Sequence, residues 1–255
     1  MEERTRHRAF MKCPDLKGEM EKSDQEMKRP QPPLGKAAAG PVIELPPFDG
    51  ALTRPAYMDL LDTRRSERSY SGAPVTQAQL AFLLWSVQGV QEIRGVNRYA
   101  AFRPVPSGGA RHPFEVYVAA LNVEGLRPGL YHYLPLEHVG EKRAAVEYLR
   151  AIDNAEDTLT EMLAGQRWAA KAPLVLFFSC LPYRGEWRYG QASHRVMLID
   201  LGHAGQNAML SAAALGWGSC CLAAYDAAKC DEVLGLDGAD EYTVYAVSAG
   251  AVSDA

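Results

Sequence analysis

The sequence lacks the features that place a protein in a membrane or on a nucleic acid. No apolar run reaches the roughly 18 residues that a membrane-spanning helix needs. The N-terminus is charged and has no apolar stretch of the signal-peptide kind. The net charge of −4 gives no electrostatic reason to bind nucleic acid or an anionic membrane. We therefore expect a cytoplasmic protein with neither partner.

Signals for disulfides, metals and dinucleotides are also missing. The five cysteines are odd in number, two are adjacent, and none forms a C-x-x-C pair. The six histidines are scattered, so we expect no metal site and interpret the cysteines as buried or idle thiols. No G-x-G-x-x-G follows a strand pattern, and neither a G-x-x-x-x-G-K-[ST] loop nor a G-x-S-x-G elbow occurs. An anion site in this chain would therefore fit a mononucleotide better than a tightly held NAD or FAD.

The composition divides the chain in two. Residues 1–50 hold seven of the sixteen prolines, nine basic and nine acidic residues, and few aliphatic ones. Such a segment cannot bury enough surface to fold alone, so we predict a tail that is disordered or draped over the body. Its one apolar patch, Ile43–Phe48, is expected to dock. Residues 51–255 form the predicted domain, and a chain that is 47% hydrophobic can build a core.

The domain pattern predicts a mixture of helices and strands. Thr76 and Gln79 form a capping box, and the helix that they open carries leucines on one face and ends at Gly89. A short helix from residue 55 is expected to turn Leu60 and Leu61 inward. Further helices are predicted at 141–164 and 193–215, and strands at 115–121, 130–133, 173–181 and 242–248. Because no regular βαβ repeat appears, this order favours an α+β sandwich over a doubly wound sheet.

Two short segments could bind a ligand. Arg64-Arg65-Ser66-Glu67-Arg68 places three guanidiniums and a hydroxyl together, which suits a phosphate monoester, although a solvated basic turn explains it as well. Pro106-Ser107-Gly108-Gly109-Ala110-Arg111-His112-Pro113 has two glycines that let backbone groups approach a flat ligand such as a flavin. An ordinary loop is the alternative, and His112 is better explained as a structural histidine than as an acid or base.

A third segment is a long helix with small residues three to four apart: Gly202, Gly205, Ala208 and Ala212. Glycine inside a helix costs about 1 kcal/mol relative to alanine, so two of them suggest close approach of another element. The approaching element is either a second subunit at a dimer interface or a neighbouring part of the same core. The sequence alone does not separate these two interpretations.

In their order along the chain, these segments resemble the nitroreductase superfamily, and most closely its SagB-type dehydrogenase branch. The match runs from about Arg54 to Gly250. Each segment alone is weak evidence for the family, but the order and spacing of all the segments make the resemblance specific. The matching pieces are Arg64-Arg65-Ser66-x-Arg68, Leu83-Leu84-Trp85 with Gln88-Gly89, Pro106-Ser107-Gly108-Gly109-Ala110 with His112-Pro113, Gly129-Leu130-Tyr131-His132-Tyr133, Gly202-His203-x-x-Gln206-Asn207 and Ala214-Leu215-Gly216-x-Gly218.

The resemblance implies a fold, a cofactor and an assembly. The fold would be a mostly antiparallel central sheet flanked by helices, and two subunits would form a homodimer with FMN at their interface. Arg64, Ser66 and Arg68 would hold the phosphate and ribityl end of FMN, with Arg65 beside them. The segment Pro106–Ala110, from the partner subunit, would line the flavin ring.

The resemblance also points to the substrate side of the flavin. Ala223 and Ala224 would lie near the N5 and O4 edge, where ordinary nitroreductases often have Glu-Gly. Residues 251–253 lack the basic residue that often follows the last strand and helps bind the phosphate. Arg188-Tyr189 stands where azoline-oxidising relatives carry a Lys-Tyr pair for proton transfer. Arginine stays protonated at pH 7 and is a poor base, which leaves Tyr189 as the candidate catalytic acid.

These implications predict an FMN-dependent oxidoreductase. We expect NAD(P)H to reduce the flavin, and the hydride to pass from N5 to a small electron-poor acceptor such as a nitroaromatic or a quinone. A second interpretation is oxidation of a thiazoline or oxazoline in a peptide, with oxygen as the final acceptor. A third is a flavin-binding protein with little turnover.

Overall fold

A central sheet organises the protein. The computed structural model describes residues 22–48, 57–96 and 99–253. Seven strands form one sheet, and every pairing between neighbours in it is antiparallel. In spatial order these are β1 (Val42–Glu44), β6 (Ala145–Arg150), β5 (Gly129–Tyr133), β4 (Phe114–Ala120), β7 (Leu174–Cys180), β9 (Tyr242–Gly250) and β8 (Gly218–Leu222). A separate hairpin joins β2 (Glu92–Arg94) to β3 (Ala100–Phe102).

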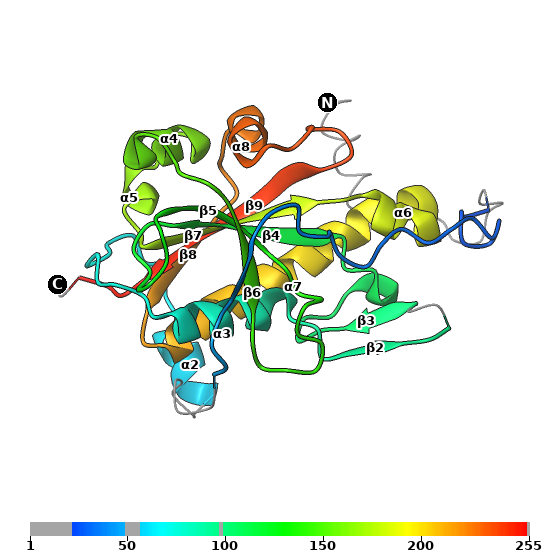
Figure 1. Ribbon diagram of the computed structural model, residues 1–255, viewed down its shortest axis with the longest axis horizontal. Helices are drawn as coiled ribbons and strands as arrows, with labels where there is room; N and C mark the ends of the chain where they lie inside the picture. The colour runs from blue at the N-terminus through cyan, green and yellow to red at the C-terminus, as the bar shows by residue number, and fades with distance from the viewer. Residues whose placement is uncertain (1–21, 49–56, 97–98, 254–255) are drawn as a thin grey trace, which may run out of the picture.

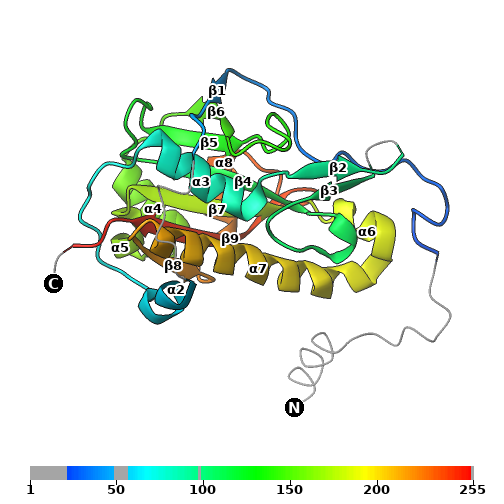
Figure 2. The ribbon, with the colours of Figure 1, turned by 90° about the horizontal axis from the view of Figure 1, so that it is seen from below.

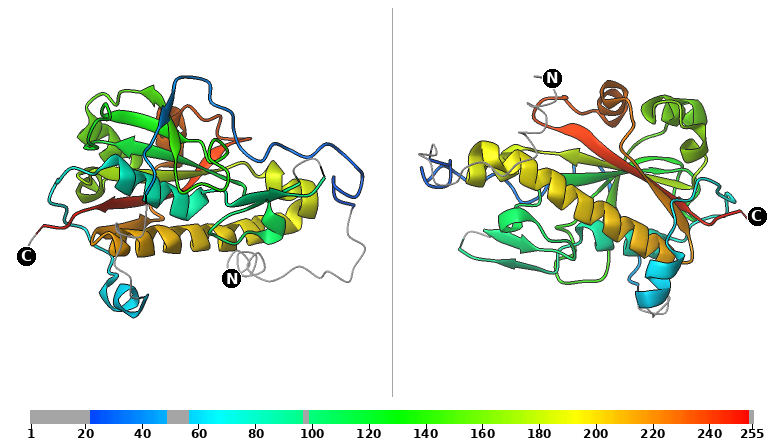
Figure 3. Two further views of the ribbon diagram at one scale, coloured as in Figure 1. Left: turned by 60° about the horizontal axis from the view of Figure 1, so that its bottom comes forward. Right: turned by 180° about the vertical axis from the view of Figure 1, so that it is seen from behind.

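Helices cover both faces of the sheet, as Figure 1 shows. One face packs against α3 (Gln77–Gln88) and α7 (Ser193–Ala214), and α7 crosses the length of that face (Figure 3). The other face packs against α4 (Ala155–Met162), α5 (Arg167–Ala170) and α8 (Ala227–Leu234). The remaining helices are α2 (Tyr57–Thr63), α6 (Tyr183–Tyr189) and the short turns η2 (Gly108–Ala110) and η3 (Gly190–Ala192). The predicted α+β sandwich with a mostly antiparallel sheet is confirmed.

The central strand β7 shows why this sandwich is stable. Alternate residues of a strand point to opposite faces, so a strand covered on both sides is apolar throughout. Leu176 and Phe178 contribute to the core beneath α3 and α7, whereas Val175 and Phe177 contribute to the core beneath α4, α5 and α8. Every residue of β7 is buried. The continuous apolar run predicted as a strand therefore occupies the middle of the sheet.

The first described segment of the chain docks on the body, as the apolar patch predicts. Its strand β1 pairs with β6 at the sheet edge, with Ile43 opposite Val146. Leu45 is completely buried, and Phe48 packs edge-on against Phe82 and Trp85 of α3. Residues 1–21 and 49–56 lie outside the described part of the chain. Within the described ranges, no helix combines the length and the apolar character that crossing a bilayer requires.

Two expectations about local structure were wrong. Residues 145–150, inside the predicted helix 141–164, form the strand β6, because they pair with β1 on one side and β5 on the other. The helix of this region begins only at Ala155. In α2 the expected burial of Leu60 and Leu61 is also absent: no residue of that helix is buried, and Leu61 is 42% exposed. The capping box of Thr76 and Gln79 is present as predicted.

Candidate cofactor site

The arginine-rich turn, residues 64–68, lies along the edge strand β8. Ser66 pairs with Ser219 in a parallel bridge, and the Glu67 amide donates to the Ser219 carbonyl at 3.0 Å. Gly218 makes this crossing possible, because a Cβ atom there would lie 2.5 Å from the Cβ of Glu67. The turn thus extends the sheet by one short strand-like segment. Its backbone is held by β8, and its side chains are left for other contacts.

The cations of the arginine-rich turn are not neutralised within the described chain. Arg65 donates to the Arg64 carbonyl at 2.8 Å, and Arg68 donates to the Ser66 carbonyl at 3.3 Å and covers the ring of Trp168. Across the described residues, none of the three guanidiniums forms a salt bridge with a carboxylate. Arg65, Ser66 and Arg68 are exposed, and Arg64 is half-buried. The turn therefore offers a concentrated donor set of the kind that a phosphate accepts.

The two alanines predicted near the flavin edge follow the same edge strand that the arginine-rich turn pairs with. Ala223 and Ala224 follow directly after β8 and are exposed. They are four to five residues beyond Ser219, and the strand β8 ends at Leu222, just before them. The carbonyl of Ala224 accepts a hydrogen bond from the side chain of Gln166 at 2.8 Å. The structure thus brings the arginine-rich turn and the predicted flavin-edge residues to one edge strand.

The glycine-rich turn, residues 106–112, has an unusual backbone. Gly109 has φ 61°, Ala110 has φ 55° and His112 has φ 45°. The left-handed region favours glycine, and alanine and histidine in it cost free energy that surrounding contacts must offset. Such strained backbone clusters at ligand and active sites. His112 is buried, and burial lowers its pKa to about 2, with the nearby charge of Arg103 acting in the same direction. It is a neutral structural residue, as expected.

Two side chains far away in sequence hold the glycine-rich turn. Asp200 of α7 accepts from the Gly108 amide with both carboxylate oxygens, at 3.2 and 3.0 Å. Arg188 of α6 donates to the Gly109 carbonyl at 3.3 Å. A Cβ atom on Gly109 would lie 2.5 Å from the Tyr189 hydroxyl, so a larger residue there would displace that side chain. Tyr189, the candidate acid, therefore lies directly against the turn.

Sequence reasoning missed Asp200. The residue is buried, and burial raises the pKa of its carboxyl, while hydrogen bonds from Ser107 and Gly108 oppose that shift. The available signal was an acidic residue on the inward side of a mostly apolar helix, because a buried carboxylate needs donors nearby. The identity of those donors was not visible, since Gly108 is 92 residues away.

The two turns do not meet within one subunit. The arginine-rich turn begins where α2 ends, and the glycine-rich turn contacts α6. Figure 2 shows α2 and α6 near opposite ends of α7, and Figure 3 agrees. A cavity of about 550 Å³ lies elsewhere, between residues 32–37, the beginning of α6 and residues 239–240. None of the predicted cofactor residues lines this cavity.

The small residues of α7 separate into two groups. Gly205, Ala208 and Ala212 are buried in the subunit, and a Cβ on Gly205 would lie 2.7 Å from the ring of Tyr245. For these three the core interpretation is correct. Gly202 is different, because a Cβ there would contact nothing within 4 Å. It belongs to an outward stripe with Leu198 and Ile199, which are 55% and 46% exposed.

Comparison with known proteins identifies relatives over most of this fold. A model of the nitroreductase family matches residues 61–251. The nitroreductase-family protein MJ1384 of Methanocaldococcus jannaschii is 33% identical over 176 residues, which cover 69% of this chain and 82% of that protein.

Two peptide-processing proteins are also similar. Trifolitoxin-processing protein TfxB of Rhizobium leguminosarum is 35% identical over 48% of this chain, and microcin B17-processing protein McbC of Escherichia coli is 29% identical over 53%. The matches span 33% of TfxB and 49% of McbC. Both relatives support the resemblance to the SagB-type branch.

Solved structures share the fold. A nitroreductase-family structure from Ralstonia eutropha superposes with a TM-score of 0.65 at 25% identity, covering 89% of this chain and all of that one. An FMN-dependent nitroreductase from Clostridium difficile superposes with a TM-score of 0.50 at 16% identity, covering 78% of this chain and 88% of that one. The second comparison is evidence for the fold alone.

Proposed function

The chain belongs to the nitroreductase family, and on that premise we propose that it is an FMN-dependent oxidoreductase that works as a homodimer. In this proposal NAD(P)H delivers a hydride to the flavin, and the flavin reduces a small electron-poor acceptor such as a nitroaromatic or a quinone. The cofactor is typical of the family. The residues that would bind it are those that the resemblance assigns, in the two turns and just after β8.

The observation that carries the proposal is the unneutralised arginine-rich turn on β8. Arg64, Ser66 and Arg68 provide charged and hydroxyl donors that fit a phosphate monoester, and no carboxylate of the described chain competes for them. Arg65 would add charge beside them. These residues would hold the phosphate and ribityl end of FMN. Arg65, Ser66 and Arg68 are exposed on this edge, and in this proposal a second subunit covers them.

The chemistry supplied by bound FMN is hydride acceptance and donation at flavin N5, so the chain need not provide a nucleophile. The task of Pro106–Ala110 would be to present backbone N–H and C=O groups to the flat ring. Asp200 and Arg188 hold that backbone in place before any ligand arrives. Ala223 and Ala224 would contact the ring edge through their backbone, leaving space for a substrate beside small side chains.

The dimer in this proposal uses the exposed faces of α2 and α7. Tyr57, Met58 and Leu61 of α2 are 62%, 64% and 42% exposed, and Leu198 and Ile199 lie outward on α7. The two helices are neighbours in the fold. Exposed apolar side chains on neighbouring elements are candidates for a protein interface. A partner placed on this surface would bring its glycine-rich turn toward the arginine-rich turn of the first subunit.

Oxidation of peptide azolines is the second candidate, favoured by the similarity to TfxB and McbC. The structure bears on the proton transfer that this reaction needs. Arg188 donates to the Tyr99 hydroxyl and to the Gly109 carbonyl, so its position is fixed by acceptors and it offers no lone pair. Tyr189 is then the group that would give a proton. A low-turnover flavin-binding protein is the third candidate.

One experiment distinguishes these candidates. An absorption spectrum of the purified protein is recorded before and after addition of NADPH, and NADPH consumption is then followed with a quinone. The proposal predicts a yellow protein that NADPH bleaches and that a quinone reoxidises with steady turnover. A yellow protein that reacts only with oxygen and an azoline peptide would support the second candidate, and a yellow protein without turnover the third. A colourless protein that takes up no added FMN would contradict all three.

A further inference from the structure

Residues 22–39, which we name the N-terminal strap, run along the outside of α6. Figure 1 shows this segment in blue beside α6. The Gln25 amide donates to the Trp187 carbonyl at 2.7 Å, and the Trp187 indole donates to the Arg29 carbonyl at 3.0 Å. The Tyr183 hydroxyl donates to Asp24 at 2.7 Å. These contacts hold the first half of the strap against the helix that carries Arg188 and Tyr189.

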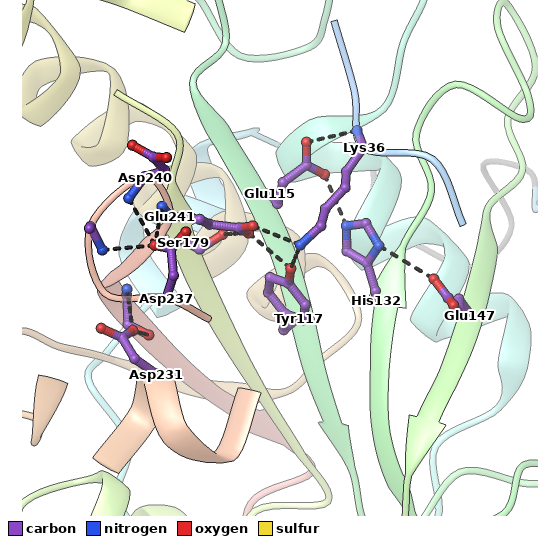
Figure 4. A network of polar contacts seen from close by, with 12 residues as sticks. Lys36, Glu115, Tyr117, His132, Glu147, Ser179, Asp231, Asp237, Asp240 and Glu241 are labelled. Atoms are coloured by element: carbon purple, nitrogen blue, oxygen red, sulfur yellow. Dashed lines mark hydrogen bonds and ion pairs between the residues drawn. The ribbon is translucent and has the colours of Figure 1, made fainter. Parts of the chain in front are cut away.

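The second half of the strap is anchored to the sheet by a polar network, shown in Figure 4. The Lys36 ammonium donates to Glu241 at 2.7 Å and to the Tyr117 hydroxyl at 2.8 Å. The Lys36 amide donates to Glu115 at 3.2 Å, and the Ala39 amide donates to Glu147 at 2.9 Å. These three carboxylates are buried, so breaking their hydrogen bonds to the strap would remove a donor from a buried charged group, which costs free energy.

Tyr99 connects the strap to the glycine-rich turn. Its hydroxyl accepts from the Gln25 side chain at 2.9 Å, and its carbonyl accepts from the Gln31 side chain at 3.1 Å. The same hydroxyl accepts from Arg188 at 2.5 Å, and Arg188 also donates to the Gly109 carbonyl. One guanidinium nitrogen therefore links the strap-bound tyrosine directly to the turn.

A buried arginine reinforces this connection. Arg111, the last residue but one of the glycine-rich turn, donates to the Tyr99 carbonyl at 3.0 Å and to the Arg184 carbonyl at 2.9 Å. Its guanidinium covers the ring of Trp187, with 4.8 Å between the guanidinium carbon and the ring centroid. Tyr99 thus contacts the turn through two arginines while the strap holds both its hydroxyl and its carbonyl.

We propose that the N-terminal strap is a positioning element of the active site, in which Gln25 and Gln31 fix Tyr99 and Tyr99 fixes Arg188 on the glycine-rich turn. The strap then decides how firmly the turn keeps its strained, left-handed backbone. This inference rests on the proposed function only where it concerns the flavin. The placement of the turn itself is a property of the folded chain and can be measured without any cofactor.

The glutamine contacts can be removed without disturbing the core. Gln25 and Gln31 are half-buried surface residues, and neither belongs to a hydrophobic cluster of the described chain. Tyr99→Phe is a second and sharper variant, because it keeps the ring, which is tilted against Trp187, and removes only the shared hydroxyl. Gln77→Ala is the matched control, since Gln77 donates to the Glu124 carbonyl on a different part of the surface.

The test is amide hydrogen exchange at Gly108 and His112, whose amides donate to Asp200 and to the Ser107 hydroxyl. Loss of one or two hydrogen bonds corresponds to about 5- to 30-fold in a local opening equilibrium. We expect exchange at these amides to accelerate by about that factor in Gln25→Ala/Gln31→Ala and in Tyr99→Phe. Amide exchange in β7 should stay unchanged in Gln25→Ala/Gln31→Ala and in Tyr99→Phe. Gln77→Ala should change exchange neither in the glycine-rich turn nor in β7. Unchanged exchange at Gly108 and His112, or equal acceleration in β7, would overturn the inference.

Flavin titration of the same variants separates this inference from the proposed function. If the wild-type protein binds FMN, the variants with faster exchange should bind it more weakly and show an altered visible spectrum, with Gln77→Ala like wild type. An unaltered affinity and spectrum despite faster exchange would limit the strap to a structural role and overturn its place in the site. If the wild-type protein binds no FMN, the proposed function fails, and the exchange measurement still decides whether the strap positions the turn.

Discussion

The Gly109 carbonyl accepts a hydrogen bond from Arg188, and the Gly109 Cα lies against the hydroxyl of the neighbouring Tyr189. This contact gives the Arg188-Tyr189 pair a structural meaning that its sequence does not reveal. Arg188 holds the glycine-rich turn, and Tyr189 is placed where a proton could be delivered to a ligand on that turn. We therefore expect Arg188→Lys to loosen the turn rather than to create a base.

The first prediction concerns Gly109. Gly109→Ala must place a Cβ 2.5 Å from the Tyr189 hydroxyl and 2.9 Å from an Arg188 nitrogen. Gly72→Ala is a matched control, because Gly72 has φ 74° but nothing within 4 Å of its Cβ position. Both variants bear the left-handed cost of roughly 1–2 kcal/mol. Only Gly109→Ala should also lose flavin affinity, because its Cβ displaces Tyr189 and Arg188. The expected loss is about tenfold for every 1.4 kcal/mol of binding free energy that these contacts provide. Urea unfolding and FMN titration measure the two effects, and equal flavin affinities would contradict the prediction.

The second prediction concerns the arginine-rich turn. Hydrogen bonds to charged groups contribute about 1.5–3 kcal/mol each, so Arg64→Ala/Arg68→Ala should weaken FMN binding by about 100-fold or more. The loss should be smaller at high salt, because screening already weakens the wild-type contacts. Arg94→Ala is the control, since Arg94 pairs with Glu92 on the exposed hairpin. Isothermal titration with FMN tests this, and a similar affinity in all three proteins would refute the assignment of the phosphate site.

The third prediction concerns assembly. Ile199→Glu places a charge on the outward stripe of α7 and should convert the dimer to a monomer without unfolding it. Val96→Glu is the control, because Val96 is 86% exposed on a different part of the chain. Gly205→Leu should instead destabilise the subunit itself, since Gly205 packs against Tyr245. Light scattering after size exclusion gives the mass of each variant. A dimeric Ile199→Glu protein would show that α7 does not form the interface.

The fourth prediction is a pH dependence of stability that arises at His112. Its folded pKa is about 2, below the ordinary value of 6.5, so between these values the unfolded chain binds a proton that the folded chain does not. The contribution of neutral His112 to the free energy of unfolding is therefore fully present above pH 6.5 and falls as the pH drops below that value. By linkage the loss amounts to about 1–2 kcal/mol at pH 5. His112→Asn should be less stable at pH 7 but lose less between pH 7 and pH 5. Urea midpoints at the two pH values measure this, and parallel losses would contradict it.

Elements with a strong local pattern were predictable from the sequence. The apolar run at 173–181 became β7, and the capping box at Thr76 opened α3, because in both cases the local preference agrees with the final packing. Residues 145–150 carry alanine, glutamate, leucine and arginine, which favour a helix, together with valine and tyrosine, which favour a strand. They form β6 because two neighbouring strands supply its hydrogen bonds, and such tertiary context overrides propensity.

The candidate site was predictable only in its parts. The arginine-rich and glycine-rich turns could be recognised because each concentrates an unusual chemistry in a few residues. Their supports could not, since Asp200 is 92 residues from Gly108, and Gln25 is 74 residues from Tyr99. Pairings of this kind depend on how the chain folds back on itself, and a single sequence carries no local signal for them.

The central claim is that one subunit contributes the arginine-rich turn and its partner contributes the glycine-rich turn of each site. Mixing equal amounts of two variants with weakened FMN binding, Arg64→Ala/Arg68→Ala and Gly109→Ala, and unfolding and refolding them together tests it most directly. In a two-fold symmetric dimer with shared sites, the mixed dimers have one site with both turns intact, so about one quarter of all sites should regain FMN and activity. No recovery, with mixed dimers shown to be present by mass, would place both turns of each site in the same subunit and contradict the account.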